Sequence, residues 1–371
     1  MTTSFLMLSA DLRKPLIFGV TAVYVLFGVC LSNKVPAFFV FGDSLVDPGN
    51  NNYIVSIAKA NYVPNGIDFG GPSGRFTNGR TIADVIGQEL GLNFTPPYMA
   101  PTTAASSILQ GVNYASAGSG ILNLTGLMWV GRINMDAQIA NFEKTRQDII
   151  SMIGVSATQD LLKKAIFMTC LGSNDFLSNY IAPIITSTAE RELISPEAFV
   201  ASMTSTFRQQ LTRLYNLGAR KFMVANVGPI GCIPSQRDLN PSAGEECVSF
   251  PDKLAQSFNV ELKKLVVELN KKLKGSIYVH ADAYHIAQDI LQNYKAYGFE
   301  NFKSSCCHMA GRFGGLVPCF PESTVCEDRS KYVFWDPFHP SEAANLVIAK
   351  RLFDGDANDV WPMNVRKLSQ V

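Results

Sequence analysis

Four short segments of this chain carry residue types that together can transfer an acyl group. They are residues 41–44 (Phe-Gly-Asp-Ser), 117–120 (Ala-Gly-Ser-Gly), 172–175 (Gly-Ser-Asn-Asp) and 336–339 (Asp-Pro-Phe-His). The first offers a hydroxyl nucleophile, the second a glycine amide, the third a side-chain amide, and the fourth a carboxylate three residues before an imidazole. This set predicts a serine esterase.

Each of these residues also has a plainer structural explanation. Ser44 can cap a helix that follows the preceding strand, whereas Gly118 and Asn174 are typical turn residues. His339 can be an ordinary loop histidine, but Asp336 is placed to hold its Nδ1 while Nε2 faces Ser44. Because all four segments occur in one chain, we favour the catalytic interpretation, with Ser44, His339 and Asp336 as a triad.

The same segments supply candidate donors for an oxyanion. These are the backbone N–H groups of Ser44 and Gly118 and the side-chain amide of Asn174. A helix beginning at Ser44 would also turn its positive end toward the developing charge. The sequence lacks G-x-S-x-G, the P-loop, G-x-G-x-x-G and H-E-x-x-H, so several other enzyme classes lose their usual markers.

Short apolar runs alternate with helical patterns, which is typical of an α/β sheet covered by helices. We expect strands at residues 37–41, 111–115, 165–171, 221–225 and 276–281. Apolar stripes at helical spacing predict helices at residues 82–90, 199–214 and 254–273, and a last helix that begins at Ser341. Glycine- and proline-rich composition predicts long loops at residues 61–80 and 228–251.

Three of the four segments follow predicted strands. In a parallel sheet the carboxyl ends of the strands share one edge, where ligands bind. Ser44, Gly118 and Asn174 should therefore lie close together, although they are far apart in the sequence. With no composition shift or linker to divide it, residues 33–371 are expected to form a single domain.

The amino-terminal residues 1–32 have the pattern of a secretory signal peptide. Arg13 and Lys14 precede an apolar run at residues 16–31, and small residues allow cleavage after Ser32. An uncleaved signal anchor is the alternative. Removal of residues 1–32 leaves equal numbers of acidic and basic side chains, which gives no reason to expect a nucleic acid or an anionic membrane as a partner. We expect secretion, no stable membrane insertion after cleavage, and a small-molecule or lipid ester as substrate.

The cysteines fit an oxidising compartment. Cys170 lies in an apolar run and is expected to stay free, while Cys232 and Cys247 flank a loop and are expected to pair. Four more should form two bridges whose pairing the sequence leaves open: Cys306, Cys307, Cys319 and Cys326. A zinc site formed by these four with His308 is the alternative. Asn93 and Asn123 begin glycosylation triplets.

The four segments resemble the blocks of the GDSL esterase/lipase family, or SGNH hydrolases, and especially its plant branch. The similar stretches are residues 39–45 continued by 47–52, 113–122, 171–175 and 334–345. The resemblance implies a flavodoxin-like three-layer α/β/α fold with a mostly parallel five-stranded sheet. It also implies ester hydrolysis without metal or cofactor, by the triad Ser44, His339 and Asp336 with Ser44, Gly118 and Asn174 as oxyanion donors.

One position departs from the plant pattern, because His308 stands where glycine commonly follows the paired cysteines. Two other functions remain open at this point. One is acyl transfer to an alcohol by the same site, and the other is a secreted binding protein that has lost turnover. The sequence predicts no oligomeric state.

Overall fold

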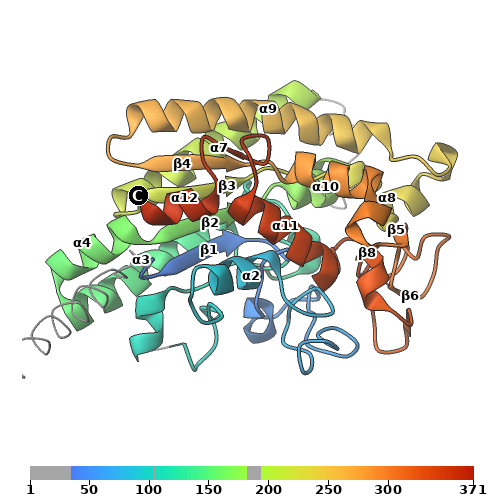
Figure 1. Ribbon diagram of the computed structural model, residues 1–371, viewed down its shortest axis with the longest axis horizontal. Coiled ribbons are helices and arrows are strands. Elements are labelled where there is room, and N and C mark those ends of the chain that lie inside the picture. Colours follow the sequence, from blue (N-terminus) through green and yellow to red (C-terminus); the bar gives the residue numbers. More distant parts are fainter. Residues whose placement is uncertain (1–34, 104, 182–193) are drawn as a thin grey trace, which may run out of the picture.

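A computed structural model describes residues 35–103, 105–181 and 194–371, so the predicted signal peptide lies outside the described residues. Its centre is a five-stranded sheet (Figure 1). Four strands are parallel and adjacent in chain order: β1 (Phe38–Gly42), β2 (Ile166–Cys170), β3 (Lys221–Ala225) and β4 (Ile277–Ala281). The fifth, β9 (Val360–Trp361), pairs antiparallel with β4.

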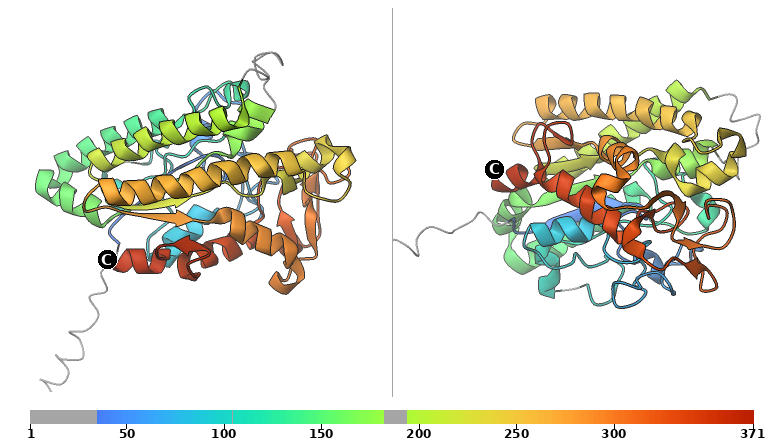
Figure 2. Two further views of the ribbon diagram at one scale, coloured as in Figure 1. Left: turned by 90° about the horizontal axis from the view of Figure 1, so that it is seen from above. Right: turned by 45° about the vertical axis from the view of Figure 1, so that its right-hand side comes forward.

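Helices cover both faces of the sheet, and the view from above shows the sheet between them (Figure 2). The residues of one core come from the strands and from α3 (Met135–Ile153), α4 (Val155–Lys164), α7 (Pro196–Asn216) and α9 (Ser249–Lys272). Those of the second core come from the strands and from α2 (Ile82–Glu89), α10 (Ala283–Gln292), α11 (Glu342–Asp354) and α12 (Val365–Gln370). The predicted mostly parallel three-layer α/β/α fold is confirmed.

The strands divide their side chains between these two cores. Phe39 and Phe41 of β1 pack in the first core, while Phe38 and Val40 pack in the second. This division follows from the two-residue period of a strand. Because both faces are covered, the strands are mainly apolar instead of alternating with polar residues, with Thr169 of β2 and Lys221 of β3 as exceptions.

The helix predictions are confirmed, and their ends have clear local causes. Thr81 and Asp84 form a reciprocal capping box at the start of α2. Ser341 caps α11, since its Oγ accepts from the N–H of Ala344 at 3.2 Å. Ser195 caps α7 in the same way.

The strand predicted at residues 111–115 is wrong as a strand, although its position beside the sheet is right. The segment runs along the free edge of β1, where Tyr114 N–H donates to the carbonyl of Val40 at 2.8 Å. Only two isolated bridges form at this segment, from Asn113 to Val40 and from Asn113 to Pro97. Gly111 has φ +111°, outside the extended region, so a regular strand cannot include it. The Asn113 side chain donates to the carbonyl of Val46 at 2.7 Å, which ties the segment to the turn after β1.

After β1 the chain first runs along one edge of this strand, at residues 112–116, and later returns along its other edge as β2. In an open α/β sheet, the point where the order reverses is a switch point, and ligands bind at the carboxyl ends of the strands there. In this molecule that point is the end of β1, immediately before Ser44.

Of the two predicted long loops, only one is free of helix. Residues 61–80 contain no helix or strand. Residues 228–251 instead contain η5 (Ile230–Cys232), α8 (Pro234–Leu239), η6 (Pro241–Ala243) and the beginning of α9. Proline explains this difference, because Pro234 and Pro241 stand at the first position of a helical turn, where the missing N–H costs nothing.

Smaller elements complete the described chain. Two two-stranded sheets pair β5 (Asn301–Ser305) with β8 (Tyr332–Phe334), and β6 (Cys307–His308) with β7 (Thr324–Val325). The short helical turns are η1 (Asn50–Tyr53), η2 (Ala105–Gln110), η3 (Leu127–Trp129), α5 (Ser173–Asp175), η4 (Phe176–Ile181), η7 (Tyr294–Tyr297) and η8 (Arg329–Lys331). Within the described ranges, no helix combines the length and the apolar character that a membrane crossing requires.

Three disulfides join the predicted cysteines. Cys232 pairs with Cys247 as expected, and the open pairing resolves as Cys306 with Cys326 and Cys307 with Cys319. The zinc alternative is therefore wrong, because the sulfur atoms it needed as thiolates are bonded to one another. Cys170 is unpaired and buried, as predicted.

Candidate active site

Ser44, His339 and Asp336 form one continuous hydrogen-bonded chain. Ser44 Oγ lies 2.8 Å from His339 Nε2, across 295 residues of sequence. His339 Nδ1 lies 2.8 Å from both carboxylate oxygens of Asp336. The predicted spatial convergence of these side chains is therefore present, and the imidazole can accept the serine proton only if Nδ1 carries the other one.

A tight turn between β8 and α11 holds both Asp336 and His339. Asp336 Oδ1 accepts from the N–H groups of Phe338 and His339, each at 2.8 Å. The carbonyl of His339 in turn accepts from the N–H of Trp335 at 2.8 Å. Since the Asp336 carboxylate bonds both its own turn and the imidazole, a spacing of three residues is enough to fix the ring.

Ser44 does not cap a helix, so both the structural alternative and the expected helix dipole at Ser44 are wrong. The residue stands in a turn directly after β1, where Asp43 Oδ1 accepts from the N–H of Leu45 at 3.0 Å. The first helical turn, η1, begins only at Asn50. A helix dipole is therefore not available at Ser44.

Gly118 and Asn174 reach the same cavity as Ser44. Gly118 has φ +79°, and a Cβ there would lie 2.6 Å from Trp129 Cδ1, so both conformation and space call for glycine. Asn174 Nδ2 donates to the carbonyl of Ser119 at 3.1 Å, which ties its side chain to the segment of Gly118. The second hydrogen of that amide group leaves a donor for a ligand.

Two buried carboxylates that the sequence analysis did not single out hold the loop around Gly118. Asp47 Oδ2 accepts from the N–H of Ala117 at 3.0 Å, while its Oδ1 accepts from Gly49 and Asn50. Asp175 accepts from two backbone N–H groups and one hydroxyl, those of Ile121, Leu122 and Thr125. Both lie in the stretches that resemble the family blocks, Asp47 in residues 47–52 and Asp175 in residues 171–175. That position was the sequence signal that could have identified them.

Gln138 of α3 is a third buried support, and no local pattern marks it. Its Oε1 accepts from the N–H of Gly42 at 3.0 Å, and its Nε2 donates to the carbonyl of the same residue at 2.8 Å. Nε2 also lies 3.2 Å from Ser119 Oγ. The side chain thus links the end of β1 to the segment of Gly118 from a position 96 residues away in sequence.

Three carboxyl groups in this network are shifted toward the neutral form. Burial raises the pKa of Asp43 from 3.8 to about 7, although the Leu45 N–H and the charge of His339 oppose this shift. Burial likewise raises the pKa of Asp47 and of Asp175 to about 6, against the hydrogen bonds that they accept. The interior beside Ser44 therefore disfavours negative charge on these groups.

A cavity of about 420 Å³ opens at Ser44 and His339. Around its mouth stand mainly apolar side chains, among them Ile57, Tyr62, Trp129, Phe320 and Phe338. A pocket of this size with few polar groups suits a small or lipid-like organic ligand.

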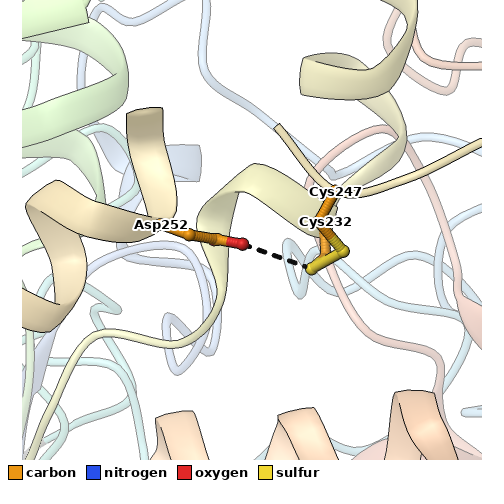
Figure 3. Close-up of side chains that lie close together, drawn as sticks. All are labelled: Cys232, Cys247 and Asp252. Atoms are coloured by element: carbon orange, nitrogen blue, oxygen red, sulfur yellow. Dashed lines mark hydrogen bonds between the residues drawn. A yellow bond between two sulfur atoms is a disulfide. The ribbon is translucent and has the colours of Figure 1, made fainter. Parts of the chain in front are cut away.

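The described residues contain one cluster with the geometry of a metal site, and its chemistry does not fit. It consists of Cys232, Cys247 and Asp252 (Figure 3). Asp252 Oδ2 lies 3.5 Å from Cys232 Sγ, but both sulfurs belong to the disulfide and offer no thiolate. Burial raises the pKa of Asp252 to about 6, which further weakens it as an anionic ligand.

Comparison with known proteins gives consistent matches. Residues 38–352 match the family model described as GDSL-like lipase/acylhydrolase. A GDSL esterase/lipase of Arabidopsis thaliana is 59% identical over 345 residues, covering 92% of this chain and 94% of the relative. A second from the same plant is 49% identical over 338 residues, with 90% and 87% covered. A third is 46% identical over 372 residues, with 96% and 99% covered.

Proposed function

Because the chain belongs to the GDSL-like lipase/acylhydrolase family, we propose that it is a secreted esterase that hydrolyses carboxylic esters with Ser44 as nucleophile. The observation that carries this proposal is the 2.8 Å contact between Ser44 Oγ and His339 Nε2. A hydroxyl is a weak nucleophile until a base within hydrogen-bond reach accepts its proton. Asp336 makes His339 such a base, because it holds Nδ1 at 2.8 Å.

The reaction proceeds in two steps. His339 Nε2 takes the Ser44 proton as Oγ attacks the ester carbonyl, and the oxyanion is bound by the amides of Ser44 and Gly118 and by Asn174. His339 then gives that proton to the departing alcohol, which leaves an ester of the acid with Ser44. Water next attacks this acyl-enzyme, His339 takes its proton and returns it to Ser44 Oγ, and the free acid leaves.

The setting of this activity is proposed to be outside the cell, with residues 33–371 as the mature single domain. Three disulfides are typical of secreted proteins, because cytosolic thiols are kept reduced. Asn93 and Asn123 are both exposed, which leaves them accessible as glycosylation acceptors. The expected cleavage after Ser32 fits the same route.

The test is the Ser44→Ala variant, assayed on short p-nitrophenyl esters. We expect loss of activity and of labelling by a fluorophosphonate, with an unchanged circular dichroism spectrum, since the exchange removes a single oxygen. Ser151→Ala, on the exposed face of α3, is the matched control and should keep both properties. Turnover retained by Ser44→Ala would reject the proposed nucleophile.

Hydrolysis and acyl transfer share every step up to the acyl-enzyme. Product analysis with a hydroxylated acceptor present separates them: we expect free acid, whereas a new ester would assign transfer. A chain that binds esters but neither turns over nor reacts with the fluorophosphonate would be a binding protein.

A further inference from the structure

The cavity at Ser44 continues into the second core, between the sheet and the helices α10 and α11. We call this face of the sheet its second face. Beyond the catalytic residues, its walls are formed by apolar residues of β2, β3, α10 and α11. We propose that this inner arm binds the acyl chain of the ester in an extended form, and that the enzyme prefers acyl chains of about ten carbons to short ones such as acetyl. This inference rests on the proposed esterase function and names its substrate class.

Two helices form the walls of the inner arm. Ala344, Ile348 and Leu352 of α11 line it, at a spacing of four residues that places them on one face. Ala283 and Ala287 of α10 line it with the same spacing, followed by Ile290 and Leu291. Alanine at three of these positions leaves the space near the catalytic turn that a longer side chain would fill.

The sheet forms the floor of the inner arm without exposing a charge. Met168 and Cys170 of β2 and Ala225 of β3 line it. Burial raises the pKa of the Cys170 thiol well above its ordinary value, so this residue behaves as a small neutral side chain. Asn226 is polar, but its side chain is bonded at both ends within the protein, since it donates to Asp282 at 2.8 Å and accepts from the N–H of Tyr284 at 2.9 Å.

The length of the inner arm follows from helix geometry. Leu352 follows Ala344 by eight positions in α11. A rise of about 1.5 Å per residue therefore gives roughly 12 Å between them along the helix. An extended chain advances roughly 3.5 Å for every three bonds of its backbone. A length of roughly 12 Å therefore accommodates about ten bonds of an acyl chain. Each methylene buried in such a site strengthens binding about fourfold, which makes chain length a strong determinant of specificity.

The orientation follows from which end of the cavity is open. At the mouth, Ile57 is 65% exposed and Phe320 is 39% exposed. In the inner arm, Ile348 is 7% exposed and Leu352 is 1% exposed. The alcohol takes a proton from His339 and must leave before water enters, so it belongs at the open mouth. The acyl chain stays attached to Ser44 and belongs in the closed arm.

The first test narrows the inner arm by Ala287→Phe. We expect the ratio of kcat/KM for p-nitrophenyl laurate to that for p-nitrophenyl acetate to fall at least tenfold. Gln288→Phe adds the same ring to the adjacent, exposed position of α10 and should change this ratio less than twofold. Ile348→Phe narrows the opposite wall and provides a second blocking variant if Ala287→Phe does not fold.

A second measurement does not depend on turnover. Lauric acid is titrated calorimetrically into Ser44→Ala, and we expect saturable binding that the added Ala287→Phe weakens at least tenfold and the added Gln288→Phe does not. If wild type lacks esterase activity while lauric acid still binds in this pattern, the proposed function fails and the apolar arm stands. If wild type hydrolyses acetate but neither the laurate ratio nor lauric acid binding responds to the blocking variants, the acyl-chain inference is overturned.

Discussion

At the residue scale, the carboxylate of Asp336 accepts hydrogen bonds from the backbone of its own turn and also contacts the imidazole of His339. A single substitution separates these two interactions. Asp336→Asn can still offer one oxygen to the N–H groups of Phe338 and His339, so the turn should persist. Its amide group would then donate toward His339 Nδ1 and place the ring proton on Nε2, where it blocks transfer from Ser44. We expect kcat on p-nitrophenyl acetate to fall on the order of 10⁴-fold.

Asp160→Asn is the matched control for this substitution, because Asp160 is exposed on α4. It should retain full turnover. A loss of less than tenfold in Asp336→Asn would mean that a different group orients the imidazole.

Asp43 links the site to the pH dependence of stability. Its pKa is raised by burial from 3.8 to about 7, so the folded protein keeps this proton where the unfolded chain has released it. Stability contributed by the neutral form is present below about pH 4 and is lost as the pH rises to about 7. At one pKa unit per 1.4 kcal/mol, this loss is at most about 4 kcal/mol.

The measurement is the free energy of unfolding in urea at pH 4.5 and at pH 7.5. Asp43→Asn cannot ionise, so relative to wild type it should become more stable at the higher pH by roughly 2–4 kcal/mol. Asp160→Asn should follow wild type at both pH values. Parallel behaviour of Asp43→Asn and wild type would show that Asp43 is charged in the folded protein across this range.

At the element scale, the loop that carries Gly118 has no regular structure of its own and depends on hydrogen bonds from elsewhere. Asp47 joins it to η1 through Ala117, the neighbour of Gly118. Asp47→Asn leaves one oxygen for N–H groups on two sides, so one of them faces an NH₂ group. We expect the Gly118 amide to move, and kcat to fall about tenfold to a hundredfold, less than the 10²- to 10³-fold for outright loss of an oxyanion donor.

KM for the same ester should change much less than kcat in Asp47→Asn, since an oxyanion donor acts mainly in the transition state. The assay is run at a temperature where circular dichroism shows wild type, Asp47→Asn and the control Asp160→Asn all folded. Equal losses in kcat and in folded fraction would assign Asp47 to stability alone.

Elements with a strong period and a clear cap were predictable from sequence. The stripe of α9 and the cap Ser341 of α11 are local signals, and the four parallel strands are short runs of mainly apolar residues. β9 is only two residues long, so no period can reveal it. Residues 111–115 have strand composition and bond the edge of β1, but only isolated bridges form there, and Gly111 leaves the extended conformation.

The candidate site was predictable to the extent that its residues lie in short blocks at strand ends. Ser44, Gly118 and Asn174 were placed together because a parallel sheet gathers the carboxyl ends of its strands. His339 was placed at Ser44 because imidazole and hydroxyl complement each other chemically. Gln138 could not be found, because its role depends on how α3 packs over the end of β1. The inner arm of the cavity is likewise a product of packing between α10, α11 and the sheet.

At the scale of the whole molecule, the two faces of the sheet are packed differently. Its first face packs against four helices in a continuous apolar core with the aromatic rings of Phe39, Phe167 and Phe222. Its second face is less completely filled, since the cavity from Ser44 extends between the strands and α10 and α11. The proposed acyl-chain site thus lies on the second face, which also has a buried apolar core of its own.

Two of the three disulfides lie beside the segment that carries Asp336. Cys306, Cys307 and Cys319 pack with the buried Trp335, which directly precedes Asp336. The pair Cys307–Cys319 closes a loop with a sequence separation of 12, and the entropy of closing such a loop corresponds to about 3 kcal/mol. Removing the pair by Cys307→Ala with Cys319→Ala should lower the free energy of unfolding by about that amount.

The same double variant should affect substrate binding more than chemistry. Pro318 and Phe320 line the mouth of the cavity beside Cys319, whereas the turn that holds Asp336 and His339 keeps its own hydrogen bonds. We expect KM to rise several-fold with kcat changed less than twofold. Cys170→Ala removes an unpaired thiol and should respond to dithiothreitol as wild type does, while the double variant should lose less stability on reduction. Equal free energies of unfolding for the double variant and wild type would show that the Cys307–Cys319 bridge does not stabilise the protein.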